Sequence, residues 1–215
     1  MPKDPRCLLL RHGETEWSKT GQHTSFTDLP LTEHGRTLVS HTAKTLIGHS
    51  LPIDLSRIRK VYVSPRLRAQ QTLELLNLPK EQGIEVETTE LLKEMDYGEY
   101  EGLKTSEIYA RDPAGEEFGT WTTGYKHVKG ESAEDVTKRI DALIAKIREE
   151  VHTPHWGEER CDVLCVAHGH VLRGFGARWL DLDIKLARGL QLDAGGVSVL
   201  GYEHHRVEEP AISRW

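Results

Sequence analysis

Three short apolar runs along the chain each end abruptly in polar residues. The runs at 7–10, 61–63 and 163–167 lead into Arg11-His12, Ser64-Pro65 and His168-Gly169 respectively. A continuous apolar run bounded by turn residues is typical of a strand buried on both faces of a parallel sheet. We therefore predict three buried strands that deliver polar side chains to loops at their carboxyl ends.

Segments of helical period separate these strands. Apolar residues recur at helical spacing from Thr32 to about Ile47 and from Pro65 to about Leu76. Ser64 followed by Pro65 predicts that the second helix begins there, with an N-cap serine and free backbone donors. The segment 115–130 has no clear period, which predicts a long loop or an excursion over the surface.

The clearest helix follows Ser132. Asp135 comes three residues later, which is the spacing of a capping box. Beyond it, apolar residues fall on one helical face, which predicts a stripe that packs in the core: Val136, Ile140, Leu143, Ile144, Ile147 and Val151.

Strands that alternate with helices predict an α/β fold. We expect a three-layer sandwich, with a mostly parallel central sheet flanked by helices, in a single domain spanning residues 1–215. In such sheets ligands bind beyond the carboxyl ends of the strands. The three polar strand ends are therefore expected to meet at one site.

Composition narrows the classes of partner. The formal charge of −6 argues against a nucleic-acid surface, and no stretch reaches the roughly 18 apolar residues of a membrane span. The N-terminal residues lack the pattern of a signal peptide, which predicts a cytoplasmic protein, with the nucleus as the alternative. On one strand, Cys161 and Cys165 would lie about 13 Å apart, too far for a disulfide.

The predicted strand ends collect the groups of an anion site. Arg11 and His12 follow the first strand, Arg68 lies one turn into the helix after the second, and His168 follows the third. Guanidinium groups present planar pairs of donors that match phosphate oxygens, and the helix after Ser64 would add backbone donors. The sequence thus predicts a phosphate-binding pocket.

Four motifs in this order resemble the histidine phosphatase superfamily, which includes the cofactor-dependent phosphoglycerate mutases. They are Leu10-Arg11-His12-Gly13-Glu14-Thr15, Ser64-Pro65-Arg66-Leu67-Arg68-Ala69 with Thr72, Leu92-Lys93-Glu94-Met95-Asp96-Tyr97-Gly98, and Ala167-His168-Gly169. The resemblance spans nearly the whole chain. It implies the phosphoglycerate mutase-like fold and a phosphatase that works through a phosphorylated histidine.

The resemblance also implies a role for each motif residue. His12 attacks phosphorus, Arg11, Arg68 and His168 hold the phosphate oxygens, and Glu94 is the general acid and base. We expect His12 to be neutral, because nearby cations disfavour imidazolium, and His168 to be protonated. Glu14 and Glu99 are the alternatives to Glu94. The resemblance implies no metal and no cofactor.

Three further stretches resemble the fungal sedoheptulose-1,7-bisphosphatase branch. They are the segments 17–24, 97–102 and 192–211. In that branch, the residues matching His23, Thr24, Tyr97 and Arg173 help to hold the sugar and its distal phosphate. The connection 181–191 is shorter here than in the branch, which predicts a more open cleft. We therefore expect a sugar phosphate or sugar bisphosphate as the small-molecule partner.

Several alternatives remain open at this stage. A broad-specificity acid phosphatase would share the pocket, a phosphoglycerate mutase would return the phosphoryl group to a bound intermediate, and a phosphate-binding module would have no turnover. Members of the superfamily often form dimers, so a homodimer is also expected. His168, His170, His204 and His205 lack the usual spacing of zinc ligands, which predicts that the histidines other than His168 are solvated or structural.

Overall fold

The computed structural model describes residues 4–48, 51, 53–78, 83–111 and 119–215. The strands are β1 (Cys7–Arg11), β2 (Ile58–Val63), β3 (Glu85–Thr88), β4 (Asp162–Ala167), β5 (Val197–Tyr202) and β6 (Pro210–Arg214). The α-helices are α1 (Glu16–Thr20), α2 (Glu33–Leu46), α3 (Leu67–Leu75), α4 (Thr105–Arg111), α6 (Ala133–Ile147) and α7 (Gly169–Trp179). Shorter helical turns are η1 (Leu55–Arg57), η3 (Glu90–Leu92), η4 (Gly98–Tyr100), η5 (Gly119–Thr123), η6 (Lys126–Val128), η7 (Arg148–His152) and η8 (Ile184–Gly189).

The described strands form one six-stranded sheet in the order β3-β2-β4-β1-β5-β6. β1, β2, β3 and β4 run parallel to one another, whereas β5 pairs antiparallel with both β1 and β6. The three strands predicted from the sequence are β1, β2 and β4, and they are adjacent. The prediction of a mostly parallel sheet is confirmed.

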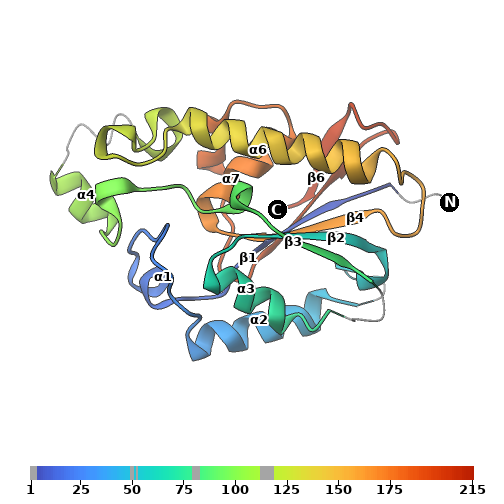
Figure 1. Ribbon diagram of the computed structural model, residues 1–215, viewed down its shortest axis with the longest axis horizontal. Coiled ribbons are helices and arrows are strands. Elements are labelled where there is room, and N and C mark those ends of the chain that lie inside the picture. Colours follow the sequence, from blue (N-terminus) through green and yellow to red (C-terminus); the bar gives the residue numbers. More distant parts are fainter. Residues whose placement is uncertain (1–3, 49–50, 52, 79–82, 112–118) are drawn as a thin grey trace.

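Helices cover both faces of the sheet (Figure 1). α6 and α7 lie on one face, and α2 and α3 lie on the other. A hydrophobic core lies on each face of the sheet, and alternate residues of β1 point into one or the other. Leu9 packs with α6 and α7, whereas Leu8 and Leu10 pack with α2 and α3. Such two-sided burial explains why these strands are continuous apolar runs rather than alternating ones.

The helix after Ser132 is α6, and it matches its prediction. Ser132 and Asp135 form the expected capping box, and the predicted stripe is buried as far as Val151, which lies in η7. The first predicted helix is α2, for which Thr32 is the N-cap.

The predicted start of the helix after β2 is wrong. α3 begins at Leu67, and Arg66 occupies its N-cap position without a side-chain hydrogen bond. Ser64 does not cap it because its hydroxyl lies 2.7 Å from Nε2 of His168. The backbone N–H of Leu67 donates instead to the carboxylate of Asp28, at 2.7 Å. The first backbone donor of α3 is thus used by the protein's own carboxylate rather than left for a ligand.

The prediction of a long loop or an excursion over the surface at 115–130 holds only in part for its described residues, of which 119, 122, 123, 126, 127 and 129 are exposed. Residues 115–118 lie outside the described residues, and the remainder forms the turns η5 and η6. Trp121 and Tyr125 are buried in the core cluster that also contains residues of α6 and α7. The segment therefore packs against the fold, held by two aromatic side chains that carry no periodic signal in the sequence.

The cysteines are all free and buried. In the described part of the chain, no helix has both the length and the apolar character needed to cross a membrane.

Candidate active site

The carboxyl ends of β1, β2 and β4 lie side by side, as predicted. The backbone N–H of His12 donates to the carbonyl of Ala167, at 2.9 Å, and that of Ser64 donates to the carbonyl of Val166, at 3.0 Å. These bonds join the residues that follow each strand into one cluster. His12, Ser64 and His168 therefore meet, although they are far apart in the sequence.

Close backbone packing fixes the loop that follows His12. A Cβ atom added to Gly35 in α2 would lie 2.2 Å from the carbonyl oxygen of Glu14, and one added to Gly13 would lie 2.7 Å from that of Gly35. The N–H of Gly13 also donates to Oγ1 of Thr72, at 3.1 Å. Because only glycine permits so close an approach, both glycines are needed to hold the main chain of His12.

The imidazole of His12 has the tautomer of a nucleophile. Its Nδ1 lies 2.7 Å from the carbonyl oxygen of Gly13. A carbonyl can only accept, so Nδ1 carries the proton and Nε2 keeps its lone pair. Burial lowers the pKa of His12 well below 6.5, and the charges of Arg68 and Arg11 lower it further. Both the hydrogen bond to Gly13 and the lowered pKa favour the neutral form that was expected for His12.

His168 differs from its prediction. Nε of Arg68 donates to Nδ1 of His168, at 3.1 Å, so that nitrogen carries no proton. Nε2 therefore carries the proton and donates to Oγ of Ser64, at 2.7 Å. Burial, and then the charge of Arg68, lower the pKa of His168 well below 6.5. The lowered pKa favours a neutral His168, chiefly because the ring is buried and also because a guanidinium faces it.

Arg68 is fully buried, and backbone groups take most of its donors. Its terminal nitrogens donate to the carbonyls of Thr24, Ser25 and Thr27, each at 3.1 Å. Arg68 therefore ties the loop of residues 24–27 to His168. Neither Arg68 nor His168 lines the cavity described below.

Glu94 lies at the amino end of α7. Its carboxylate accepts backbone hydrogen bonds from Met95, His170 and Val171, at 2.9 to 3.0 Å. Two of these donors belong to the first turn of α7, where the helix dipole favours an anion. The side chain is 6 % exposed and still reaches the cavity.

The two alternative acids do not line the cavity. Glu14 accepts from the hydroxyl of Thr32, at 2.7 Å, and Glu99 forms an exposed pair with Lys129. Of the three glutamates considered from the sequence, only Glu94 is in position to act on a bound molecule.

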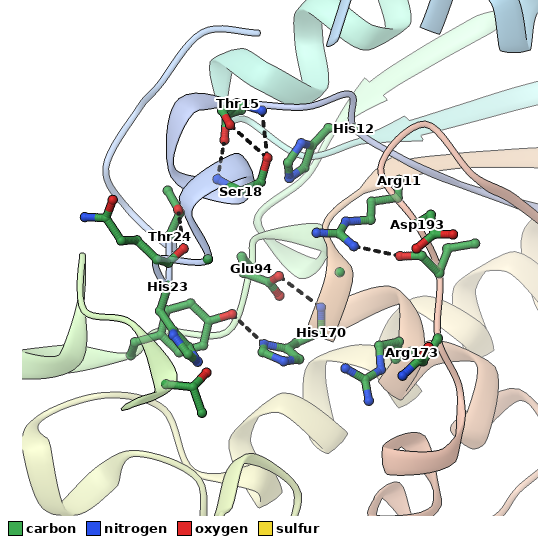
Figure 2. Close-up of a pocket in the computed structure, with 17 residues that line it drawn as sticks. Arg11, His12, Thr15, Ser18, His23, Thr24, Glu94, His170, Arg173 and Asp193 are labelled. Atoms are coloured by element: carbon green, nitrogen blue, oxygen red, sulfur yellow. Dashed lines mark hydrogen bonds between the residues drawn. The ribbon is translucent and has the colours of Figure 1, made fainter. Parts of the chain in front are cut away.

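A cavity of about 350 Å³ lies beyond these strand ends. Figure 2 shows Arg11, His12 and Glu94 around it, with His23 and Arg173 on opposite sides. All four substrate-side residues predicted from the sequence also line it, namely His23, Thr24, Tyr97 and Arg173. The structure thus brings together seven of the nine predicted site residues on one surface, Arg68 and His168 being the other two.

Arg173 is held in a fixed orientation at the edge of the cavity. Its guanidinium donates to the carbonyls of Ala187 and Arg188, at 3.2 and 3.1 Å. It also lies over the ring of Trp121, with 5.1 Å between the guanidinium carbon and the ring centroid. The connection 181–191 therefore contributes to the site, because its carbonyls orient this arginine.

Sequence reasoning missed His170, which lines the cavity and is neither solvated nor remote. Its Nδ1 shares a 2.6 Å hydrogen bond with the hydroxyl of Tyr97, and burial lowers its pKa well below 6.5. The sequence does carry one signal that could have identified His170. It lies two residues after His168, in the first turn of the helix that follows a strand. His204 and His205, by contrast, are exposed and pair with Glu209 and Asp4.

Within the described ranges, no three or more His, Cys, Asp or Glu side chains are grouped so that they could hold a metal ion.

Comparison with known proteins agrees with this geometry. Residues 7–214 match the model of the histidine phosphatase superfamily (branch 1). The sedoheptulose 1,7-bisphosphatase of Saccharomyces cerevisiae is 34 % identical, over 97 % of this chain and 91 % of that protein. An acid phosphatase of Mycobacterium tuberculosis is 36 % identical, over 94 % of this chain and 89 % of its own length.

The fold has close structural neighbours as well. The solved structure of an open reading frame product from M. tuberculosis superposes with a TM-score of 0.80 at 33 % identity, covering 98 % of this chain and 96 % of that one. The chain belongs to the histidine phosphatase superfamily, branch 1. It is a phosphoric monoester hydrolase of that superfamily.

Proposed function

We propose that this enzyme hydrolyses a sugar phosphate or sugar bisphosphate of the sedoheptulose 1,7-bisphosphate type through a phosphohistidine on His12. The observation that carries the proposal is the neutral His12, with a free Nε2, in a cavity that also presents Arg11 and Glu94. A neutral imidazole is a nucleophile, an arginine stabilises the phosphoryl oxygens, and a carboxyl group can exchange protons with the leaving oxygen.

In the first step, Nε2 of His12 attacks phosphorus while the bond from phosphorus to the sugar oxygen breaks. This step requires Glu94 to be protonated, which the negative charge of a phosphate bound beside it favours. Glu94 gives its proton to that oxygen, so the sugar leaves as an alcohol. In the second step, Glu94 takes a proton from water, and the resulting hydroxide attacks phosphohistidine. Inorganic phosphate leaves, and both His12 and Glu94 return to their starting forms.

Arg11 is the cation placed best to hold the transferring phosphoryl group. It lines the cavity beside His12, and its Nη1 donates a 2.7 Å hydrogen bond to the carbonyl of Leu192. Its buried Nε has no partner among the described residues, which leaves a donor for a phosphate oxygen. We propose that Arg68 and His168 stabilise the same group from behind His12, where their donors are shared with the protein.

Among these substrates, the position of Arg173 favours a sugar bisphosphate over a sugar monophosphate. It lines the same cavity as His12 and is half-buried, and its carbonyl partners orient the guanidinium without neutralising it. A second phosphate on the sugar would find its counter-charge there. His23, Thr24 and Tyr97 would contact the carbon chain between the two phosphates.

A broad-specificity acid phosphatase is the second candidate, favoured by the similarity to the M. tuberculosis acid phosphatase.

The test that separates the two functions is phosphate release from a panel of sugar mono- and bisphosphates, phosphoglycerates, nucleotides and an aryl phosphate, with EDTA present. We expect a sugar bisphosphate to exceed the other esters about 100-fold in kcat/KM, and His12→Ala to lose turnover. Flat rates across the panel would favour the acid phosphatase, and mutase activity on phosphoglycerates would contradict hydrolysis as the main reaction.

A further inference from the structure

A second cavity adjoins the catalytic one. It measures about 150 Å³, against about 350 Å³ for the cavity that holds His12. Both cavities are lined by His23, Thr105 and His170. The centroids of the His23 and His170 rings lie 6.1 Å apart, so these two imidazoles stand at the boundary between the two spaces.

The walls of the second cavity are aromatic and rich in hydroxyl groups. The aromatic and hydroxyl side chains are those of Tyr100, Thr105, Tyr109, Thr120 and Tyr125, together with three imidazoles. Among the described residues that line it, none is Lys, Arg, Asp or Glu. Burial lowers the pKa of both His23 and His170, so the boundary imidazoles are neutral as well.

The surroundings of the second cavity contrast with the other side of the catalytic cleft. On that side Arg173 provides a fixed positive charge, and His170 lies between Arg173 and His23 (Figure 2). A bound molecule can therefore extend from His12 in two chemically different directions. One direction suits an anionic group, and the other suits an uncharged group that both packs on rings and forms hydrogen bonds.

We infer that the second cavity binds an uncharged, hydroxylated ring carried by the substrate beyond its phosphorylated part, such as a glycosyl unit. A sugar ring has apolar C–H faces that pack on tyrosine rings and hydroxyls that bond to Tyr and Thr hydroxyls and to imidazole nitrogens. A second phosphate is disfavoured there, because burying a dianion without a cation is costly. The inference rests on the proposed phosphatase reaction and adds a substrate class to it.

The test uses a matched pair of substrates, glycerol 3-phosphate and its 2-O-glucosyl derivative. Both present the same phosphate and the same leaving oxygen, so a difference in kcat/KM reports the glucosyl ring alone. We expect the wild-type enzyme to prefer the glucosyl derivative about tenfold.

Two variants change residues that line the second cavity and not the catalytic one, although Thr120 also shares a 2.6 Å hydrogen bond with the hydroxyl of the buried Tyr125. Thr120→Trp would fill it, and Tyr109→Ala would remove a wall whose side chain is already 43 % exposed, so the fold should tolerate the change. Both should reduce the preference below about threefold and leave kcat/KM for glycerol 3-phosphate within about twofold of wild type. Leu186→Ala, an exposed position that lines neither cavity, is the control and should retain the preference.

Each outcome bears on a different claim. Equal kcat/KM for the two esters in the wild-type enzyme, or a preference that survives in both variants, would overturn the second-cavity assignment while leaving the phosphatase intact. A preference that is equally strong for a glucuronosyl derivative would contradict the uncharged character of the site. Failure to hydrolyse either ester, or any other phosphomonoester, would overturn the proposed function together with this inference.

Discussion

Arg68 donates a 3.1 Å hydrogen bond from Nε to Nδ1 of His168, and this bond fixes the tautomer of a buried histidine. The same guanidinium holds the carbonyls of Thr24, Ser25 and Thr27. One side chain thus couples the loop that lines the cavity to the ring packed beside the nucleophile.

Arg68→Lys should therefore lower both stability and activity, although it keeps the positive charge. A lysine ammonium cannot reproduce the planar set of donors, and the buried carbonyls it leaves unpaired should cost about 2 to 4 kcal/mol of unfolding free energy. We expect kcat/KM to fall about 100-fold. The surface substitution Arg59→Lys, at an exposed pair with Glu158, is the control and should change neither quantity.

A positioning role for Arg68 can be separated from a merely structural one. Nitrogen NMR of the histidine side chains should show His168 with its proton on Nε2 in the wild-type protein, and a mixture of tautomers in Arg68→Lys. An unchanged tautomer in a folded but inactive variant would contradict the positioning role.

The pH dependence of kcat/KM should reflect the lowered pKa of His12. Burial and the two arginine charges keep the imidazole neutral below pH 6.5, so protonation of the nucleophile should not reduce the rate near that pH. After correction for the substrate's own second ionisation, near pH 6 for a phosphate ester, the acid limb of kcat/KM should lie well below 6.5. A midpoint at 6.5 that persists after this correction would show that His12 titrates normally.

Replacing the general acid should affect substrates according to their leaving groups. Glu94→Gln cannot supply a proton, so hydrolysis of a sugar phosphate, which releases an alkoxide, should slow about 10²- to 10⁴-fold. An aryl phosphate with an acidic phenol should slow far less, because its leaving group needs little protonation. Glu99→Gln, at an exposed ion pair, is the matched control. Equal losses on both substrates would contradict the acid role.

Buried neutral histidines should make the fold less stable in acid. His152 shares a 2.7 Å hydrogen bond with the hydroxyl of Tyr202, and burial lowers its pKa to about 3. Between pH 6.5 and 3 the unfolded chain then binds one proton more than the folded chain at this residue. The unfolding free energy should therefore fall by about 1.4 kcal/mol for each pH unit below 6.5 on account of His152 alone.

Denaturant unfolding at pH 7, 6 and 5 checks this slope. His152→Gln keeps a polar partner for Tyr202 but cannot take up the proton, so its slope should be shallower by that amount. His204 provides a comparison of opposite sign, because its hydrogen bond to Glu209 raises its pKa. Because a raised pKa adds stability only as the pH falls towards 6.5, His204→Gln should make the loss of stability steeper between pH 7 and 6 and leave the slope between pH 6 and 5 unchanged. An identical slope in all three proteins would refute the histidine linkage.

Much of the fold could be predicted from the sequence because the burial of a strand or a helix sets the pattern of apolar residues within that element. β1, β2 and β4 are apolar on both faces since helices cover both sides of the sheet, and α6 has a capping box and a single apolar stripe. The motif residues Arg11, His12 and Glu94 were found for a related reason. Arg11 and His12 follow an apolar strand directly, and Glu94 was predicted from a motif that resembles the histidine phosphatase superfamily.

Tertiary structure alone decided which polar groups pair with one another. Nothing local shows that Asp28 would take the N–H of Leu67, that Ser64 would turn to His168, or that a guanidinium rather than a carboxylate would face His168. A hydrogen bond between residues 39 to 104 positions apart depends on where the whole chain places them, and no short-range pattern encodes it. For the same reason, the cavity beside Tyr109 and the place of His170 on its boundary emerged only from the folded structure.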